Sequence, residues 1–329
     1  MCGIVGMVNY KEDISEQDSM IRNMTKKLSK RGPDEEGVFL EKHCNLGHRR
    51  LSIIDIENGK QPMSCTIDEV TYTIVYNGQI YNTKELRETL LDNGFKFNGH
   101  SDTEVLLKSY VFYGKDVCKH LNGIFAFAIW NGKTEELFLA RDHFGIKPLY
   151  YAMLENHLIF GSEVKAMFAH PLVKPKLDKT GISELFGIGP SHTPGMSPFK
   201  DIDELEPAHF IVYNKNGFQK HEYWKLETKE HTDELETTCE KLRFLIQDSI
   251  DRQLVSDVPL CCLLSGGLDS SIITAYASKY YQEKWGRKLS TFSVDYVDQD
   301  KNFVKSDFQP NSDNYYIDLM VKEFRYRPS

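Results

Sequence analysis

The sequence begins MCGIVG at residues 1–6, so a cysteine stands second, directly before an apolar run. If Met1 is removed, Cys2 carries both a thiol and a free α-amino group. Such an amino group has a pKa of about 8 and can accept the proton of the thiol, so no histidine is needed as a base. The opening therefore predicts a nucleophile, although most cysteines are simply small buried side chains. The apolar run at 3–8 predicts a β-strand.

Further runs of strand length are rich in Val, Ile, Phe and Tyr and are bounded by Gly, Asn or Pro; they lie at 71–75, 124–130, 137–140, 158–160 and 209–213. These runs predict β-sheets with few helices. Helical periodicity occurs at 17–28 and 83–93, where we expect Thr83 as the N-cap and Gly94 as the stop. The first domain is therefore predicted as α+β over residues 2–213, with a linker at 214–234.

The pattern changes after the linker. Apolar residues recur every three or four positions between Leu235 and Leu254, which predicts an amphipathic helix. VPLCCLL at 258–264 is continuously apolar, as expected for a strand buried on both faces of a parallel sheet. SGGLDSS, a helical run and a second strand, LSTFSV at 289–294, follow. Residues 235–329 thus predict the start of an α/β domain, with about two strands where a sheet averages five or six.

Composition limits the classes of function. A chain of 329 residues favours two domains, and its 40% hydrophobic and 27% charged residues are ordinary for a globular protein. A formal net charge of -8 argues against nucleic-acid binding as the main function. The sequence has neither a membrane-length apolar run nor a signal peptide, so we expect a cytoplasmic protein. Its seven cysteines contain no CxxC pair, which indicates neither a disulfide framework nor a zinc site.

An oxyanion hole for Cys2 could come from YNGQIYN at 76–82. On its own, an Asn-Gly pair favours a tight turn. Alternatively, the side-chain amide of Asn77 and the backbone N–H of Gly78 could both donate hydrogen bonds to a developing oxyanion.

Two further motifs could hold an amino acid. HRRLSIID at 48–55 contains two arginines, and a guanidinium beside a pocket is suited to bidentate capture of a carboxylate. SDTEVLL at 101–107 indicates a capping box in which Ser101 is the N-cap and Glu104 lies three residues later. Its Asp102 could also receive an ammonium group.

Eight segments within about the first 170 residues together resemble one family: MCGIVG, KRGPDEEG, GHRRLSIID, YNGQIYN, SDTEVLL, LNGIFAFAIWN, LARDHFGIKPLYY and FGSEVKAM. The chain resembles the class II glutamine amidotransferases and, within them, the asparagine synthetases. The resemblance implies a four-layer αββα sandwich of the N-terminal nucleophile hydrolase type. It also implies that Cys2 attacks the amide of glutamine and releases ammonia, without a cofactor.

The resemblance further implies a glutamine site. Arg50 would bind the carboxylate, Asp102 the ammonium group, and Asn77 with Gly78 would form the oxyanion hole. The whole implied glutamine-binding set is Arg50, Leu51, Ser52, Ile53, Ile54, Asn77, Gly78, Gln79 and Asp102. The usual family pattern has glutamate where this chain has Gln79, so one negative charge is missing from the rim. We expect this position to contribute its backbone, which makes the change harmless.

SGGLDSS lies between a predicted strand and a predicted helix, where free backbone N–H groups and a helix N-terminus suit a phosphate. It lacks the GK[ST] of a Walker loop. In context it resembles the pyrophosphate loop of ATP pyrophosphatases. That resemblance assigns pyrophosphate and its Mg²⁺ to Ser265, Gly266, Gly267, Asp269 and Ser270, with Asp269 reaching the metal through pyrophosphate. It assigns adenosine to Leu264 and Val294.

The order of the two halves is that of asparagine synthetases, in which ATP activates aspartate, and ammonia from glutamine displaces AMP. The resemblance thus implies glutamine, aspartate, ATP and Mg²⁺ as ligands. Two alternatives stay open: a non-synthesising glutaminase or glutamine-binding remnant, and a β-lactam-synthetase-like enzyme, a class that typically lacks the N-terminal cysteine. Full-length relatives continue beyond this sequence. We therefore expect an incomplete second domain, which a homodimer or a partner chain could cover.

Overall fold

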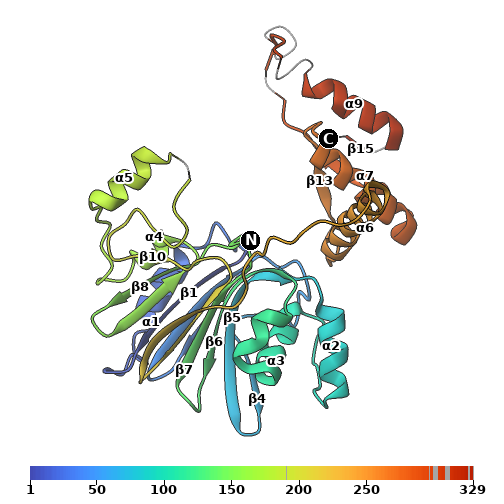
Figure 1. Cartoon of the computed structure of the whole chain (residues 1–329). Helices are drawn as coiled ribbons and strands as arrows, with labels where there is room; N and C mark the ends of the chain where they lie inside the picture. Colours follow the sequence, from blue (N-terminus) through green and yellow to red (C-terminus); the bar gives the residue numbers. More distant parts are fainter. Residues whose placement is uncertain (190, 296, 299–302, 308–311, 325–326, 329) are drawn as a thin grey trace. The chain divides into compact units, whose positions relative to one another are not determined.

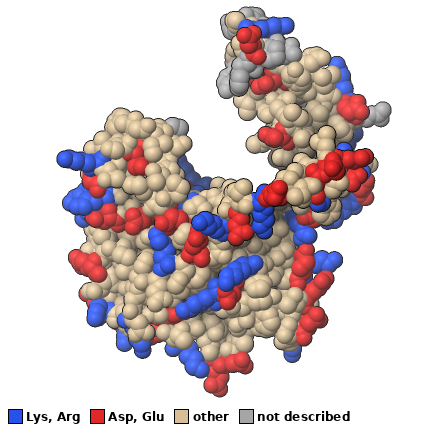
Figure 2. Space-filling view, viewed as in Figure 1, with Lys and Arg blue, Asp and Glu red and all other residues tan. Residues whose placement is uncertain are grey.

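The computed structural model describes the chain except for residues 190, 296, 299–302, 308–311, 325–326 and 329 (Figure 1). The chain divides into two compact units, Met1–Thr228 and Lys229–Ser329, which are described separately below. No helix in the described part of the chain combines the length and the apolar character needed to cross a lipid bilayer. On the face shown in Figure 2, basic and acidic side chains are interspersed over the first unit and do not gather into a stripe of one sign.

Two antiparallel six-stranded sheets form the first unit. The first sheet runs, in spatial order, β10 (Asp203–Glu204), β8 (Tyr150–Leu154), β9 (His157–Gly161), β1 (Gly3–Asn9), β3 (Cys44–Arg50) and β2 (Glu35–Leu40). The second runs β12 (Gly217–Glu222), β11 (His209–Asn214), β7 (Glu136–Arg141), β6 (Gly123–Asn131), β5 (Val70–Ile80) and β4 (Met63–Ile67). All of the strands predicted in this unit are present within these sheets.

Alternation along β1 explains the layers. Ile4 and Val8 pack between the two sheets, against residues such as Trp130 of β6. Val5 and Met7 point the other way, because successive side chains of a strand face opposite sides, and they pack against α1 (Asp18–Lys26). Every side chain of β1 is therefore buried. The strand lies at the centre of the unit and carries Cys2 at its leading end.

Two of the remaining helices cover the second sheet. The first-unit helices beyond α1 are α2 (Thr83–Asp92), α3 (Asp102–Tyr113), the 3₁₀ helix η1 (Gly114–His120), α4 (Val164–Met167) and α5 (Lys179–Gly187). Buried residues of α2 and α3 pack on the outer face of β5 and β6, as Leu90 and Leu106 do. Figure 1 shows α1 on one side of the paired sheets and α2 with α3 on the other. The predicted αββα sandwich is thus confirmed.

Three local predictions in this unit need correction. Asn82, not Thr83, is the N-cap of α2, and its side chain makes no capping hydrogen bond. Ser101 does cap α3 by accepting the N–H of Glu104 at 3.2 Å, but the Glu104 carboxylate accepts the N–H groups of Asn98 and Gly99, so the expected capping box is only half formed. The tight turn that an Asn-Gly pair favours on its own is absent as well. Residues 77 and 78 continue β5, because they pair with residues 126 and 125 of β6.

The second unit is an α/β unit. It contains α6 (Leu235–Gln253), β13 (Cys261–Leu263), α7 (Leu268–Trp285), β14 (Ser290–Phe292), α9 (Asp313–Phe324) and β15 (Arg327–Pro328). Its described strands form a parallel sheet in the order β13-β14-β15. Both predicted strands and the helices at α6 and α7 are present. The third strand, β15, was not predicted.

Burial in the second unit differs from the prediction. The run at 258–264 was expected to be buried on both faces, yet only Cys261–Leu263 form a strand, and Leu263 is 77% exposed. The reason is the small size of the hydrophobic core, whose buried members are Ile250, Leu254, Ala277 and Leu289. A strand is buried only where other layers cover it, and the described residues of this unit supply little cover.

Candidate active site

The start of β1 opens into a cavity of about 120 Å³. Its lining comes from the two residues before β1, the end of β3 and the segment after it, the end of β5, the start of α3, β6 and the loop after β7. The lining residues are Met1, Cys2, Arg50, Leu51, Ile53, Ile54, Gly59, Gln61, Tyr76, Asn77, Gly78, Gln79, Asp102, Thr103, Ile124 and Lys147. The fold thus brings together the predicted glutamine-binding residues with one exception. Ser52 is absent from the lining, and its backbone N–H instead donates to Asp34 Oδ2 at 2.8 Å.

The thiol of Cys2 sits in a largely buried environment. The backbone N–H of Leu51 donates to Cys2 Sγ at 3.4 Å, and the Cys2 carbonyl accepts a hydrogen bond from Arg31 Nε at 2.8 Å. Burial raises the pKa of the thiol, and the Leu51 hydrogen bond and the nearby amino terminus partly oppose this effect. The thiol therefore needs a proton acceptor beside it before it can act as a nucleophile.

The amino terminus is one such group, since its charge acts on the thiol. With Met1 attached, its ammonium donates to the carbonyl of Arg31 at 3.1 Å. Burial lowers the pKa of this amino group; Cys2 opposes the effect, while the charges of Arg31 and Lys147 add to it. The α-amino group of Cys2 itself becomes available only when Met1 is removed.

Asn77 and Gly78 lie at the back of the cavity, at the end of β5. The side chain of Asn77 is 1% exposed, and its Nδ2 makes no hydrogen bond with any described residue. A buried donor without a partner is costly and calls for an explanation. Only glycine fits at position 78 without a clash, because a Cβ added there would lie 2.3 Å from the carbonyl oxygen of Ile124. Together they leave room and a donor for an oxygen atom of a ligand.

Asp102 supplies a buried carboxylate to the same cavity. Its Oδ2 accepts hydrogen bonds from Tyr76 Oη at 2.9 Å and from the backbone N–H of Ile80 at 3.2 Å. Burial raises the pKa of this carboxyl group, while the two hydrogen bonds oppose that shift. A cationic group entering the cavity would favour the charged carboxylate further.

Arg50 lies in a cage of oxygen atoms. Its Nη1 donates to Glu35 Oε2 and to the Ile56 carbonyl, each at 2.9 Å. Its Nη2 donates to the carbonyls of Ile54, at 3.2 Å, and Asp55, at 2.7 Å. Nε–H is thus the guanidinium donor without a partner among the described residues. The expected bidentate capture of a carboxylate through both terminal nitrogens would require this cage to rearrange.

Arg49 makes different contacts. Its Nε donates to the carbonyl of Gly32 at 2.7 Å, and its Nη1 pairs with Glu36 at 2.9 Å. It does not line the cavity, whereas Arg50 does.

Sequence reasoning missed several lining residues. Gln61 Oε1 accepts the backbone N–H of Tyr76 at 2.7 Å, and its Nε2 donates to Thr103 Oγ1 at 3.3 Å. This amide therefore links the strand that carries Asn77 to the helix that carries Asp102. Lys147 reaches the cavity from the loop after β7; it stands within LARDHFGIKPLYY, a segment whose role the sequence alone did not indicate.

The predicted nucleotide residues lie in the second unit. Leu264, Ser265 and Val294 line a cavity of about 260 Å³ together with Leu263, Phe292, Ser293 and Asp313. Gly266, Gly267, Asp269 and Ser270 do not line it. Instead, Ser270 Oγ lies 3.0 Å from Ser265 Oγ, and Asp269 borders a groove between α6 and α7. Gly266 has a φ of +82°, and α7 begins two residues later. A glycine turn at a helix N-terminus fits a phosphate group.

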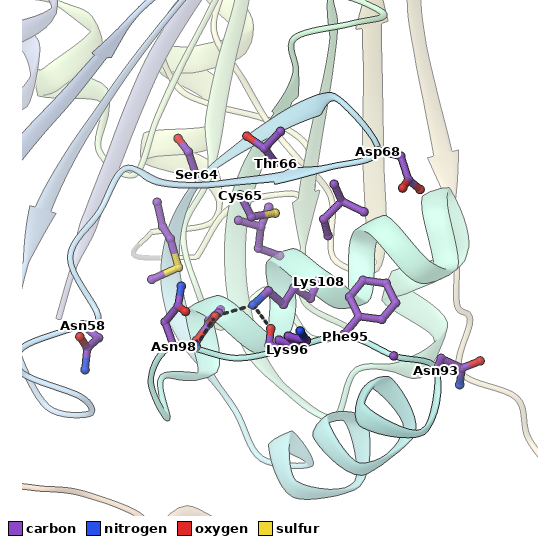
Figure 3. Close-up of a pocket in the computed structure, with 15 residues that line it drawn as sticks. Asn58, Ser64, Cys65, Thr66, Asp68, Asn93, Phe95, Lys96, Asn98 and Lys108 are labelled. Atoms are coloured by element: carbon purple, nitrogen blue, oxygen red, sulfur yellow. Dashed lines mark hydrogen bonds and ion pairs between the residues drawn. The ribbon is translucent and has the colours of Figure 1, made fainter.

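A larger cavity of about 640 Å³ contains none of the predicted glutamine-site residues (Figure 3). It lies between β4, the segment 93–98 and α3. There Lys108 Nζ donates to Glu104 Oε1 at 2.5 Å and to the carbonyl of Lys96. Glu104 also accepts the N–H of Asn98 at 2.9 Å. These buried charges satisfy one another, so they anchor the loop before α3.

Comparison with known families and curated proteins agrees with this geometry. Residues 1–224 match the family model described as glutamine amidotransferase domain, and residues 241–328 match the one described as asparagine synthase. The chain is 49% identical to asparagine synthetase [glutamine-hydrolyzing] 3 of Bacillus subtilis (strain 168), over 98% of this chain and 53% of that protein. It is 31% identical to asparagine synthetase B [glutamine-hydrolyzing] of Escherichia coli (strain K12), over 89% of this chain and 50% of that protein. The chain thus spans about half the length of these curated relatives.

Solved structures show the same fold. The glutamine phosphoribosylpyrophosphate amidotransferase of B. subtilis has a TM-score of 0.51 and 18% identity, and the match covers 93% of this chain and 69% of that one. The allosteric regulatory enzyme of purine biosynthesis has the same TM-score and identity, over 94% and 69%. At this identity the likeness concerns the fold alone. Because the amidotransferase model matches more than half of its residues, the chain belongs to the glutamine amidotransferase family, and its second unit is similar to asparagine synthase.

Proposed function

We propose that the first unit hydrolyses glutamine to glutamate and ammonia, with Cys2 as the nucleophile after removal of Met1. The observation that carries this proposal is the unpartnered buried amide of Asn77, which shares one small cavity with the thiol of Cys2 and the carboxylate of Asp102. A donor, a nucleophile and an ammonium-binding group are the parts that amide hydrolysis of an amino acid needs.

The reaction would proceed in two halves. The α-amino group of Cys2 accepts the thiol proton, and the thiolate attacks the carboxamide carbon of glutamine. The oxyanion formed there accepts hydrogen bonds from Asn77 Nδ2 and the N–H of Gly78. The protonated amino group then gives its proton to the leaving ammonia, and a thioester remains. Water, deprotonated by the same amino group, hydrolyses the thioester to glutamate and restores the thiol.

Two charged side chains would recognise the α-ammonium and α-carboxylate groups of glutamine. Asp102 binds the ammonium group, and Arg50 attracts the carboxylate through its charge and its Nε–H. Leu51, Ile53, Ile54 and Gln79 form the wall between them, with Gln79 contributing backbone. Ser52 supports this wall from outside the cavity through its contact with Asp34.

For the second unit we propose participation in asparagine synthesis by the whole protein. The asparagine synthetase family uses ATP. We propose that Leu264 and Val294 contact adenosine, and that Ser265, Gly266, Gly267, Asp269 and Ser270 hold pyrophosphate with Mg²⁺. ATP and aspartate would give an aspartyl-adenylate, which ammonia converts to asparagine and AMP. The lining of one cavity by Leu264 and Val294 and the glycine turn before α7 support this assignment.

The organisation of the protein is part of the same proposal. We place the glutaminase domain at residues 2–228, because residues 217–222 of the predicted linker form β12 and pair with β11. Residues 235–329 would be the part of the synthetase domain present in this chain. A cytoplasmic location suits the substrates. A second copy or a partner chain would cover the exposed apolar residues of the second unit.

The test of the glutaminase proposal uses the purified chain. Intact mass should show that the chain begins at Cys2, and the protein should convert glutamine to glutamate and ammonia. Cys2→Ala should abolish turnover while thermal unfolding stays unchanged. Cys239→Ala makes the same change at an exposed cysteine of the second unit and should leave turnover intact. Turnover that survives Cys2→Ala would remove Cys2 from the mechanism.

A further inference from the structure

Lys147 carries a buried positive charge with a poor partner. The residue is 8% exposed, and the contact of its ammonium is the thioether of Met1, 3.2 Å from Nζ to Sδ. No carboxylate oxygen of the described residues lies within 4.0 Å of this ammonium. A thioether is only a weak acceptor, and a buried charge without a carboxylate is costly. The position of this lysine therefore calls for a functional explanation.

The backbone of Lys147 is held by hydrogen bonds at both its carbonyl and its N–H group. Arg141 Nε donates to the Lys147 carbonyl at 2.8 Å, and the Lys147 N–H donates to Asp142 Oδ2 at 2.9 Å. Arg141 is itself held by an ion pair with Glu204 at 2.9 Å. These bonds hold the backbone from which the Lys147 side chain reaches Met1, in the cavity that Cys2 also lines.

The proposed glutaminase chemistry makes one demand on that amino terminus. The α-amino group of Cys2 must be in its free-base form to take the thiol proton. An ordinary α-amino group has a pKa of about 8 and is therefore mostly protonated at neutral pH. A neighbouring positive charge favours the free base.

We propose that Lys147 acts through the α-amino group of Cys2, keeping it in the free-base form once Met1 is removed and so moving the onset of catalysis to lower pH. This inference rests on the proposed function of Cys2. Lys147 is a positioning residue in this sense, since it takes no bond-making part in the reaction.

The surrounding charges support the choice of this lysine. Burial lowers the pKa of the present amino terminus; Cys2 opposes this effect, while Arg31 and, to a smaller extent, Lys147 add to it. Arg31, however, already donates to the Cys2 carbonyl and pairs with Glu163, so its charge is partly compensated. The other titratable or charged groups that act on the amino terminus, the thiol or Lys147 are Asp34, Arg50, Asp102 and Asp142.

The experiment follows two rates as a function of pH in wild type and Lys147→Met: kcat/KM for glutamine, and alkylation of Cys2 by iodoacetamide in the absence of glutamine. Each rate should rise with pH as the amino group loses its proton, and we call this rise the acid limb of the profile. Removing the charge of Lys147 should move the acid limb of both profiles to a pH about one unit higher. At pH values below this rise, both rates of Lys147→Met should be roughly tenfold lower than those of wild type. At pH values above it, the two proteins should have equal rates. A purely structural role would lower the rates equally at every pH.

Two variants serve as controls. Lys147→Arg keeps a positive charge and should restore the wild-type limb. Lys115→Met removes a charge from an exposed lysine that pairs with Glu136 outside the cavity, and should not move the limb. An unshifted limb in Lys147→Met, or an equal loss at every pH, would overturn the inference.

Two further outcomes are also decisive. If Lys147→Met does not fold, the wild-type alkylation profile decides, because a limb at or above about pH 8 would mean that the amino group is ordinary. If wild type alkylates with a low limb but does not hydrolyse glutamine, the proposed function fails, while the effect of Lys147 on the amino group stands.

Discussion

The strand β1 in the first unit and the strand β13 in the second were predicted from similar apolar runs, but they have different environments. Every side chain of β1 is buried, whereas Leu263 of β13 is 77% exposed. The difference lies in the neighbours. β1 has a paired strand on each side, a second sheet on one face and α1 on the other. An apolar run thus shows that a strand can be buried, and the surrounding layers decide whether it is.

The sharpest test of this comparison is hydrogen exchange. Amides of β6, inside the sandwich, should exchange only by global unfolding, with opening free energies of about 5–15 kcal/mol. Amides of β13 should open with less than about 3 kcal/mol, because few buried contacts hold them. Exchange followed by mass spectrometry would measure both segments in one sample. Equal protection of β6 and β13 would break the comparison.

Truncation of one phenylalanine in each unit gives the next largest effect. Phe127 is completely buried between β5, β7 and the covering helices, so Phe127→Ala should destabilise the first unit by about 3–5 kcal/mol. Phe292 is 46% exposed, and Phe292→Ala should cost less than about 1 kcal/mol. Denaturant unfolding monitored for each unit gives both values. A large loss at Phe292 would mean that the second unit is packed in solution.

Within the first unit, Asn77→Ala tests whether the buried amide of Asn77 contributes to catalysis. The amide of Asn77 has no partner to lose among the described residues, so stability should change little while kcat for glutamine falls by roughly 10²–10³. Steady-state kinetics and thermal unfolding separate the two quantities. A large drop in stability with unchanged kcat would instead indicate a structural amide.

Arg50→Lys should have the smallest of these effects. Lysine keeps the charge but cannot fill the cage of three carbonyls and Glu35, so KM for glutamine should rise by a factor equivalent to about 1.5–3 kcal/mol. Arg49→Lys is the matched control, since Arg49 lies outside the cavity, and it should change KM far less. Equal changes in both variants would show that the wrong arginine has been assigned.

Much of this fold could be predicted from local pattern. Six strands of the sandwich were predicted because apolar residues mark them, namely β1, β5, β6, β7, β9 and β11, whereas β2, β3, β4, β8, β10 and β12 were not predicted. Cys2 was found because its position is chemically special. The tight turn that an Asn-Gly pair favours on its own is absent, because pairing with β6 continues the strand through both residues.

Other parts of the site depend on contacts between distant segments. The cage around Arg50 forms because the backbone at residues 54–56 folds back on it. No residue type in the sequence indicates this backbone conformation. Lys147 reaches the amino terminus because Arg141 is anchored by Glu204, more than sixty residues later in the chain. Gln61 joins two elements through a single amide. Such contacts follow from tertiary packing, so the sequence named neither Gln61 nor Lys147 as part of the site.

The unpartnered amide of Asn77 also has a consequence for inhibitor design. An alkylating analogue of glutamine can bond to Cys2 without placing an oxygen near Asn77 Nδ2, which then stays without a hydrogen bond in the adduct. A γ-aldehyde analogue would form a hemithioacetal, whose oxygen can accept that hydrogen bond. Reversible aldehydes should therefore bind far more tightly than their carbonyl reactivity alone suggests, and Asn77→Ala should remove that advantage while leaving irreversible alkylation almost unaffected.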